Sequence, residues 1–222
     1  MAFPFGYNKD CTSKEQILAK VRNAILEKDE NHFIDINLLD DTWIPVKEED
    51  GNEFTFIERF KNNGGIFMYF EEMSHFKEAM KQFVSENNWS PLLTTSPKIK
   101  EIFADTDIDF CDDYKDLNRK KNVSIVDCEC LIAQTGSVLV SDVTAGSRMS
   151  YSCADILLVL ARPSQFVNKI KDALLLMKDR YGNELPSGMT ILSGPSCSAD
   201  IDNTLVVGAL GCKQLALFLV EE

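Results

Sequence analysis

Histidine is scarce in this sequence, and its scarcity restricts the chemistry that we expect. Only His32 and His75 occur among the 222 residues. A hydrolase of the Ser-His-Asp type uses histidine as its general base, so we do not expect one. Cys128 and Cys130 are the only closely spaced cysteines, with one residue between them. Zinc and iron–sulfur sites use four ligands and usually have two intervening residues. We therefore predict no bound metal and no cofactor.

Clusters of positive charge are also lacking. The chain has 23 basic and 35 acidic side chains and a net charge of −12. No run of Lys and Arg exceeds Arg119-Lys120-Lys121. An acidic surface of this kind repels nucleic-acid phosphates and anionic lipids. We therefore exclude nucleic acid as the main partner and interpret the acidity as a source of solubility.

Long hydrophobic runs are missing as well. The run from Ile156 to Ala161 is far too short to span a membrane. Met1 to Tyr7 is a short, aromatic and uncharged segment, unlike a signal peptide. The seven cysteines are an odd number scattered along the chain, whereas a secreted disulfide scaffold pairs an even set. These patterns predict a cytoplasmic protein with reduced thiols and no membrane insertion.

The composition indicates a single domain over residues 1–222. Hydrophobic residues make up 45% of the chain and charged residues 26%, which is enough for one well-buried core. An amphipathic helix is predicted over Glu15 to Leu26, because apolar residues recur there at helical spacing. Residues 29–65 are rich in Asp, Glu and Asn, with one helix predicted around Phe54 to Asn62. Residues 1–65 would thus form a helical and irregular N-terminal segment.

Strands and helices alternate along the rest of the chain. Short apolar runs bounded by turn residues predict strands at 66–70, 123–126, 137–141, 156–161, 189–193 and 215–220. Helices are predicted to begin at Ser74, at Ser96-Pro97 and at Ser164, with a short one over Cys128 to Ile132. This alternation favours an α/β fold built on a mainly parallel open sheet with helices on both faces.

Three small-residue turns next to these strands are the best candidates for a binding site. They are Thr135-Gly136-Ser137, Gly146-Ser147-Arg148, and Gly194-Pro195-Ser196 followed by Ser198 and Asp200. Turns that follow parallel strands meet at the carboxyl edge of the sheet. Hydroxyl groups, backbone N–H groups and Arg148 would bind a carboxylate or phosphate there. A helix that begins near Ser198 would add its own N–H groups. We therefore predict one pocket for a small anionic ligand.

Each of these features also has a purely structural interpretation. Ser198 can cap a helix that has Asp200 in its first turn. Asp142 can hold Arg148 in an ordinary ion pair. Asp200 and Asp202 are two residues apart and would point in different directions on a helix, so they do not form a catalytic pair. No catalytic residue is assigned.

Several motifs, taken in order, resemble those of the lactate utilization protein C family, whose members contain a LUD domain. The string Ser193-Gly194-Pro195-Ser196-Cys197-Ser198-Ala199-Asp200-Ile201 is similar to the family's G-P-S-x-T-A-D-I. The later string Gly208-Ala209-Leu210-Gly211-Cys212 is similar to G-x-H-G-P. Ala133-Gln134-Thr135-Gly136-Ser137 is similar to A-E-T-G-[ST]. The resemblance is strong over about 125–222, weak in the middle of the chain, and visible again near 13–28.

The resemblance implies a fold and a biological setting. The implied fold is the NagB/RpiA/CoA transferase-like fold of sugar-phosphate isomerases, CoA transferases and 5-formyltetrahydrofolate cyclo-ligases. The implied role is in oxidising L-lactate to pyruvate beside iron–sulfur partner proteins. This chain has Gln134, Leu210 and Cys212 where the family usually has Glu, His and Pro, so it lacks any chemistry that those Glu and His groups perform.

Two functions remain open at this point. The first is a component of lactate utilization that binds a small carboxylate or another anionic ligand and docks onto iron–sulfur partners. Alternatively, the chain is a stand-alone enzyme on a phosphorylated sugar, an acyl-CoA or a folate-type substrate. A pocket that contains only hydrogen-bond donors would favour the first function. A pocket that holds a carboxyl group with a raised pKa would favour the second.

Overall fold

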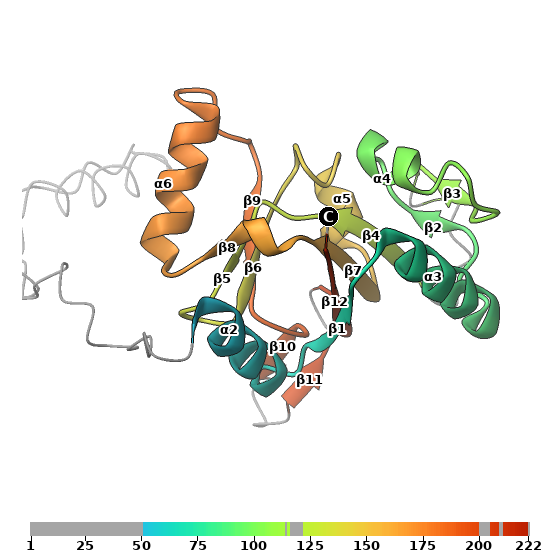
Figure 1. Ribbon diagram of the computed structural model, residues 1–222, viewed down its shortest axis with the longest axis horizontal. Helices are drawn as coiled ribbons and strands as arrows, with labels where there is room; N and C mark the ends of the chain where they lie inside the picture. Colours follow the sequence, from blue (N-terminus) through green and yellow to red (C-terminus); the bar gives the residue numbers. More distant parts are fainter. Residues whose placement is uncertain (1–50, 114, 116–121, 200–204, 209–210, 222) are drawn as a thin grey trace, which may run out of the picture. The chain divides into compact units, whose positions relative to one another are not determined.

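A parallel sheet of six strands forms the centre of the computed structural model, which describes residues 51–113, 115, 122–199, 205–208 and 211–221 (Figure 1). In spatial order its strands are β1 (Ile66–Phe70), β12 (Gln214–Val220), β7 (Ile156–Ala161), β4 (Val123–Asp127), β2 (Leu92–Leu93) and β3 (Phe110–Cys111). All neighbouring pairs are parallel. The prediction of an α/β fold on a mainly parallel sheet is confirmed.

A second, smaller sheet has the order β8 (Phe166–Val167), β5 (Cys130–Ile132), β6 (Ser137–Ser141) and β9 (Met189–Leu192). β6 is antiparallel to both of its neighbours. The prediction that 137–141 and 189–193 belong to the central parallel sheet is therefore wrong. The reason is the short link before β6: four residues join β5 to β6, whereas a parallel crossover needs a dozen or more. β10 (Cys197–Ala199) and β11 (Leu205–Val207) form a separate antiparallel pair.

The helices are α2 (Gly51–Asn62), α3 (Met73–Asn87), α4 (Pro97–Ile102), α5 (Arg148–Ser152) and α6 (Ile170–Tyr181), and Pro163–Gln165 form a 3₁₀ turn. The helix predicted from Ser96-Pro97 is confirmed, with Ser96 at its N-cap and Pro97 at its first position. Of the helices that the structure describes, none combines the length and the apolar character that crossing a bilayer requires.

Two predicted helices are wrong. The apolar run at 130–132 is the strand β5, because it pairs with β6 and β8. The periodicity of a short buried run does not show whether it forms a strand or a helix. The helix predicted from Ser164 begins only at Ile170, because Phe166–Val167 first pair with β5. The Ile170 N–H then donates to the side-chain oxygen of Gln134 at 3.3 Å, which satisfies one of the free N–H groups at the start of α6.

The core has layers on both faces of the central sheet. On one face, α3 and α4 pack through Phe76, Met80 and Ile99. On the other face lie Phe56 and Phe60 of α2, Tyr151 of α5, and the inner side chains of the second sheet. α6 covers the far side of that second sheet with Ala173 and Met177. One face of the central sheet is thus covered partly by a sheet and not by helices alone.

Candidate functional site

A cavity of about 540 Å³ lies beside β9. Three parts of the chain form its walls: the end of α5, β9 with the segment that follows it, and the residues just before β12. The lining residues are Tyr151, Ser152, Thr190, Ile191, Leu192, Ser193, Gly194, Ser196, Cys197, Gly211 and Cys212. Of the described residues that line it, none is Asp, Glu, His, Lys or Arg. The cavity therefore offers neutral hydroxyl, thiol, apolar and backbone groups.

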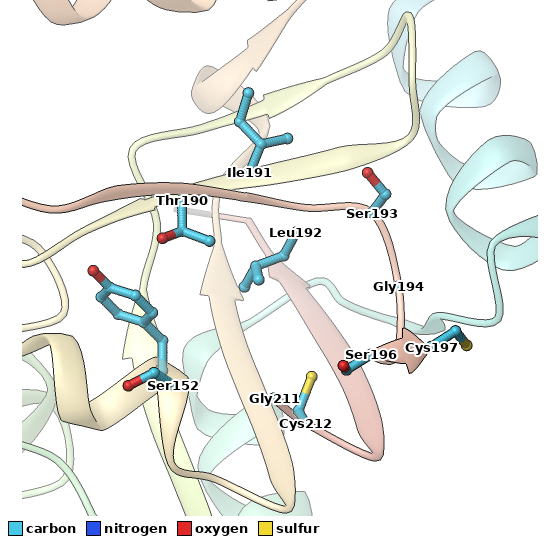
Figure 2. A pocket seen from close by; sticks show the side chains of 11 residues that line it. Ser152, Thr190, Ile191, Leu192, Ser193, Gly194, Ser196, Cys197, Gly211 and Cys212 are labelled. Carbon is cyan, nitrogen blue, oxygen red and sulfur yellow. The ribbon is translucent and has the colours of Figure 1, made fainter. Parts of the chain in front are cut away.

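The side chains of β9 alternate about this cavity. In Figure 2, Thr190 and Leu192 extend to the side of the strand where Cys212 and Ser196 lie, and Ile191 extends to the opposite side. The Ser196 N–H donates to the Cys212 carbonyl at 2.8 Å, which fixes the segment after β9 against the segment before β12. Cys212 is buried, and this burial raises the pKa of its thiol, so the thiol is protonated at neutral pH.

The cavity lies toward the amino edge of the central sheet, not the carboxyl edge that we predicted for the site. Gly211 and Cys212 come just before β12, and Ser152 comes shortly before β7. The Lys213 N–H donates to the Asp155 carbonyl at 2.7 Å, which joins the starts of these two strands. The carboxyl ends of β7 and β12 are at the other edge.

The structure brings together two of the three predicted turns, at one end of the second sheet. The Ser137 hydroxyl donates to Thr135 Oγ1 at 2.7 Å, and its oxygen lies 2.8 Å from Ser193 Oγ. The Asn63 side chain donates to the Thr135 carbonyl at 2.9 Å, and Arg59 donates to the Gln134 carbonyl. The end of α2 thus holds the turn at 135–137 in place.

Two glycines in this region are sites of close backbone approach. A Cβ at Gly136 would lie 2.4 Å from the Phe60 nitrogen, and one at Gly194 would lie 2.2 Å from the Asn63 carbonyl oxygen. Pro195 also packs against Gly64. Gly194 and Ser196 line the cavity, whereas Thr135, Gly136, Ser137 and Pro195 do not. The glycines therefore have a structural task, which is to let α2 and the two loops meet.

The third predicted turn, Gly146-Ser147-Arg148, lies at the other end of β6, because β6 begins at Ser137 and ends at Ser141. Arg148 Nε is 3.5 Å from Asp142 Oδ2, and its Nη2 donates to Ser187 at 2.7 Å. The hydrogen bond from Ser187, and then Arg148, lower the pKa of Asp142. Arg148 thus forms the structural ion pair with Asp142, and the prediction that all three turns form one pocket is wrong.

Gly146, Ser147 and Ser198 make local structural contacts. The Ser147 hydroxyl accepts from the Met149 N–H at 3.2 Å and so caps α5, and Gly146 packs against Thr95. Ser198 lies in β10, which pairs with β11, so the helix predicted to begin near Ser198 is wrong as far as Ala199. Asp200 lies outside the described residues. A binding role for these residues stays a prediction.

The sequence did not identify several residues that line the cavity. Ser152, Thr190 and Leu192 carry no motif. Ser152 is the last residue of α5, and the only signal for Thr190 and Leu192 is the alternation in β9, which places both on one face. Whether β9 borders a cavity depends on the order of the strands, which contacts between distant residues determine.

Two buried carboxylates, Asp127 and Glu129, were also not predicted from the sequence. Neither residue lines the cavity. Glu129 is fully buried, and accepts from Ser141 at 2.5 Å, from the Tyr181 hydroxyl at 2.8 Å and from Arg180. Asp127 is paired with Lys98 at 2.5 Å and with Arg162 at 3.6 Å. Both carboxylates are paired with cationic side chains, which is typical of structural ion pairs.

No metal-binding arrangement is visible among residues of the described ranges: no three or more His, Cys, Asp or Glu side chains gather there as ligands. Burial raises the pKa of Cys130 to about 12 and also raises that of its neighbour Cys128. Metals bind the thiolate form. The prediction of a metal-free protein stays a prediction.

The model of the LUD domain family matches residues 55–220, from α2 to the last residue of β12. The chain belongs to the LUD domain family. A crystal structure of a DUF162 family protein from Deinococcus radiodurans matches this LUD domain with a TM-score of 0.58 and 14% sequence identity. The match covers 79% of this chain and 99% of that one, and it shows the same fold. The LUD domain family is associated with lactate utilization.

Proposed function

We propose that this LUD domain chain is a ligand-binding component of lactate utilization, which acts beside iron–sulfur partner proteins and binds a small carboxylate in the cavity beside β9. The observation that supports this proposal is the chemistry of the walls. They carry hydrogen-bond donors and apolar groups, and among the described lining residues there is no carboxylate or histidine to act as a general base.

A small monocarboxylate suits these walls. Its carboxylate accepts hydrogen bonds from the hydroxyl of Thr190 and from backbone N–H groups. Its hydrocarbon part contacts Leu192. A single charge also suits a chain with a net charge of −12, because a multiply charged phosphate ester is repelled more strongly.

The alternative function, a stand-alone enzyme, has less support. It would be favoured by a carboxyl group of raised pKa in the cavity wall. The buried carboxylates Asp127 and Glu129 do not line the cavity, and each is paired with cationic side chains.

Calorimetric titration of the purified full-length chain with lactate, pyruvate and inorganic phosphate tests the ligand. We expect lactate or pyruvate to bind and phosphate to bind more weakly. Thr190→Val, which removes one hydroxyl, should weaken carboxylate binding by about 3- to 10-fold, and Ser85→Ala on the exposed surface of α3 is the control. No binding of either acid, or equal binding by Thr190→Val, would contradict the proposed site.

The partner proposal needs a separate experiment. A tagged copy of the chain is purified from its native cell, and the proteins that accompany it are identified by mass spectrometry. Iron–sulfur proteins should be recovered in near-stoichiometric amounts. Recovery of the chain by itself under gentle lysis counts against the proposal.

A further inference from the structure

The cavity runs along the edge of β9 and not over one of its faces. Three consecutive residues of the strand, 190–192, and the two residues that follow it line the cavity. Because side chains alternate along a strand, a cavity over one face would be lined by every second residue. Ile191 lines the cavity although its side chain extends away from Thr190 and Leu192 (Figure 2). A cavity at the edge contacts successive residues of the strand, whichever way their side chains point.

The hydrogen-bond pattern shows which backbone groups face this edge. β9 pairs with β6, and no other described strand pairs with it. The Asp142 N–H donates to the Gly188 carbonyl at 3.0 Å, so the next hydrogen-bonded pairs in the ladder are Val140–Thr190 and Val138–Leu192. The N–H and C=O of Ile191 therefore point away from β6.

A second hydrogen bond supports this assignment. Leu139 stands opposite Ile191, and its carbonyl accepts from the Glu129 N–H at 2.8 Å, on the side of β5. The backbone of Leu139 thus faces away from β9. The backbone of Ile191 is left to the outer edge, along which the cavity runs.

The residues of β9 themselves provide none of the usual protection of an edge strand. The sequence of β9 is Met-Thr-Ile-Leu, without charge or proline, and Met189 and Ile191 are 39% and 40% exposed. Proteins normally blunt such an edge with charges, proline or a covering segment. A neutral edge beside a preformed cavity is the arrangement that binds an extended chain by strand addition.

We propose that the ligand of this cavity is an extended, amide-bearing acid, namely a short peptide segment with a free carboxylate, which adds to the edge of β9. The inference rests on the proposed function, because it names the class of carboxylate that the same cavity takes. Amide groups of the ligand pair with the N–H and C=O of Ile191. The carboxylate of the ligand accepts a hydrogen bond from the hydroxyl group of Thr190.

Size and charge select this ligand among others. A volume of about 540 Å³ lies in the range of cavities that hold drug-sized ligands and is far larger than a three-carbon acid needs. The neutral walls select uncharged side chains, because a charged one would lose its hydration without gaining a partner. A second copy of the chain is a poor occupant, because two surfaces of net charge −12 repel each other.

The first test compares ligands on the full-length chain by calorimetric titration. The probes are N-acetyl-alanyl-alanine, its analogue with both amide nitrogens methylated, and lactate. The parent peptide should bind at least about 10-fold more tightly than lactate, and methylation should weaken it by about 3- to 10-fold for each hydrogen bond lost. If lactate binds and the parent peptide is no tighter, or if methylation changes nothing, the inference is overturned while the proposed function stands. If none of the probes binds, both are overturned.

The second test removes the donor from the protein. Ile191→Pro deletes an N–H that points away from β6, and proline is tolerated at such a position of an edge strand. Ile66→Pro, at the first residue of the edge strand β1 in the other sheet, is the matched control. Ile191→Pro should lose about 3- to 10-fold in affinity for the parent peptide, a larger loss than for lactate, and Ile66→Pro should bind as the wild type does. An unchanged affinity of Ile191→Pro contradicts the inference. If circular dichroism shows that Ile191→Pro is unfolded, the comparison of methylated and parent peptides decides.

Discussion

Gly136 and Gly182 both have a positive φ, of +61° and +59°, but their surroundings differ. A Cβ at Gly136 would lie 2.4 Å from the backbone nitrogen of Phe60, whereas one at Gly182 would meet nothing within 4 Å. Both positions thus have a positive φ, which favours glycine, and only Gly136 also lacks room for a side chain. Gly136 is therefore required to avoid a clash with Phe60 as well as to adopt a positive φ.

We expect Gly182→Ala to lower the free energy of unfolding by about 1–3 kcal/mol, because the backbone of Gly182, with φ of +59° and ψ of −120°, lies in a region that residues with a side chain rarely adopt. Gly136→Ala should cost at least about 2 kcal/mol more, because α2 must move away from the turn at 135–137. Urea unfolding followed by circular dichroism measures both. Equal losses for the two variants would mean that the close approach to Phe60 has no energetic weight.

At the scale of elements, α6 is attached to the second sheet by a charged contact as well as by apolar ones. Glu129 is fully buried between β4 and β5, and Arg180 and Tyr181 at the end of α6 both bond to its carboxylate. Removing the cation leaves a buried negative charge with only hydroxyl donors. Such a loss is costlier than removing both charges together.

Arg180→Met should therefore destabilise the chain by about 2–4 kcal/mol, somewhat below the range for fully buried pairs because Arg180 is partly exposed. Glu129→Gln combined with Arg180→Met should recover part of this loss. The measurement is a double-mutant cycle of unfolding free energies. Additive losses in the cycle would show that the two side chains are not coupled.

Asp155 joins three central strands at their amino ends. Its carboxylate accepts from the Asn122 N–H at 3.0 Å, before β4, and pairs with Lys213 at 2.8 Å, before β12. The hydrogen bond with Lys213, and then that with Asn122, lower the pKa of Asp155. A group whose pKa is lowered by folding stabilises the folded state above its unfolded pKa of about 3.9, and this contribution is lost as the pH falls through the folded pKa.

Asp155→Asn should thus cost about 1 kcal/mol at pH 7, and the difference from the wild type should shrink below about pH 4. Unfolding by urea at a series of pH values measures it. Lys213→Met is expected to show part of the same pH dependence. A difference that stays constant from pH 7 to pH 3 would exclude this carboxylate as its origin.

The element scale also explains what could be predicted. Apolar runs such as 156–161 identify buried strands because their length and flanks are distinctive. Runs such as 137–141 identify a strand equally well, but they do not reveal its partners, since pairing depends on contacts between distant residues. The sequence therefore predicted the parallel centre, and it missed the division into two sheets that the four-residue link before β6 imposes.

The candidate site was less predictable for the same reason. Gly194 and Ser196 were found from a motif, and they do line the cavity. Thr190 and Leu192 line it only because β9 is an edge strand of the second sheet. Arg148 was assigned to the site from its position in a glycine turn, yet β6 separates it from Ser137 at the other end of the strand.

At the scale of the whole molecule, the ligand groups for a metal are few and dispersed. Only two histidines occur, and the seven cysteines are spread from residue 11 to residue 212. The most closely spaced pair, Cys128 and Cys130, is buried, with thiols whose pKa is raised and which are therefore protonated at neutral pH. A metal would have to displace both protons and draw further ligands from strands that are already paired. We therefore expect this chain to hold no iron–sulfur cluster of its own.

The full-length chain, purified without added metal, should therefore contain less than about 0.1 equivalent of iron, zinc or acid-labile sulfide, where a closed site would hold one metal ion or cluster with four ligands. Inductively coupled plasma mass spectrometry and a sulfide assay measure these quantities. The double variant Cys128→Ala, Cys130→Ala serves as the control for adventitious binding. About one metal per chain that disappears in the double variant would show that these thiols form a site, and would move the chain from a ligand-binding component to a metal-carrying one.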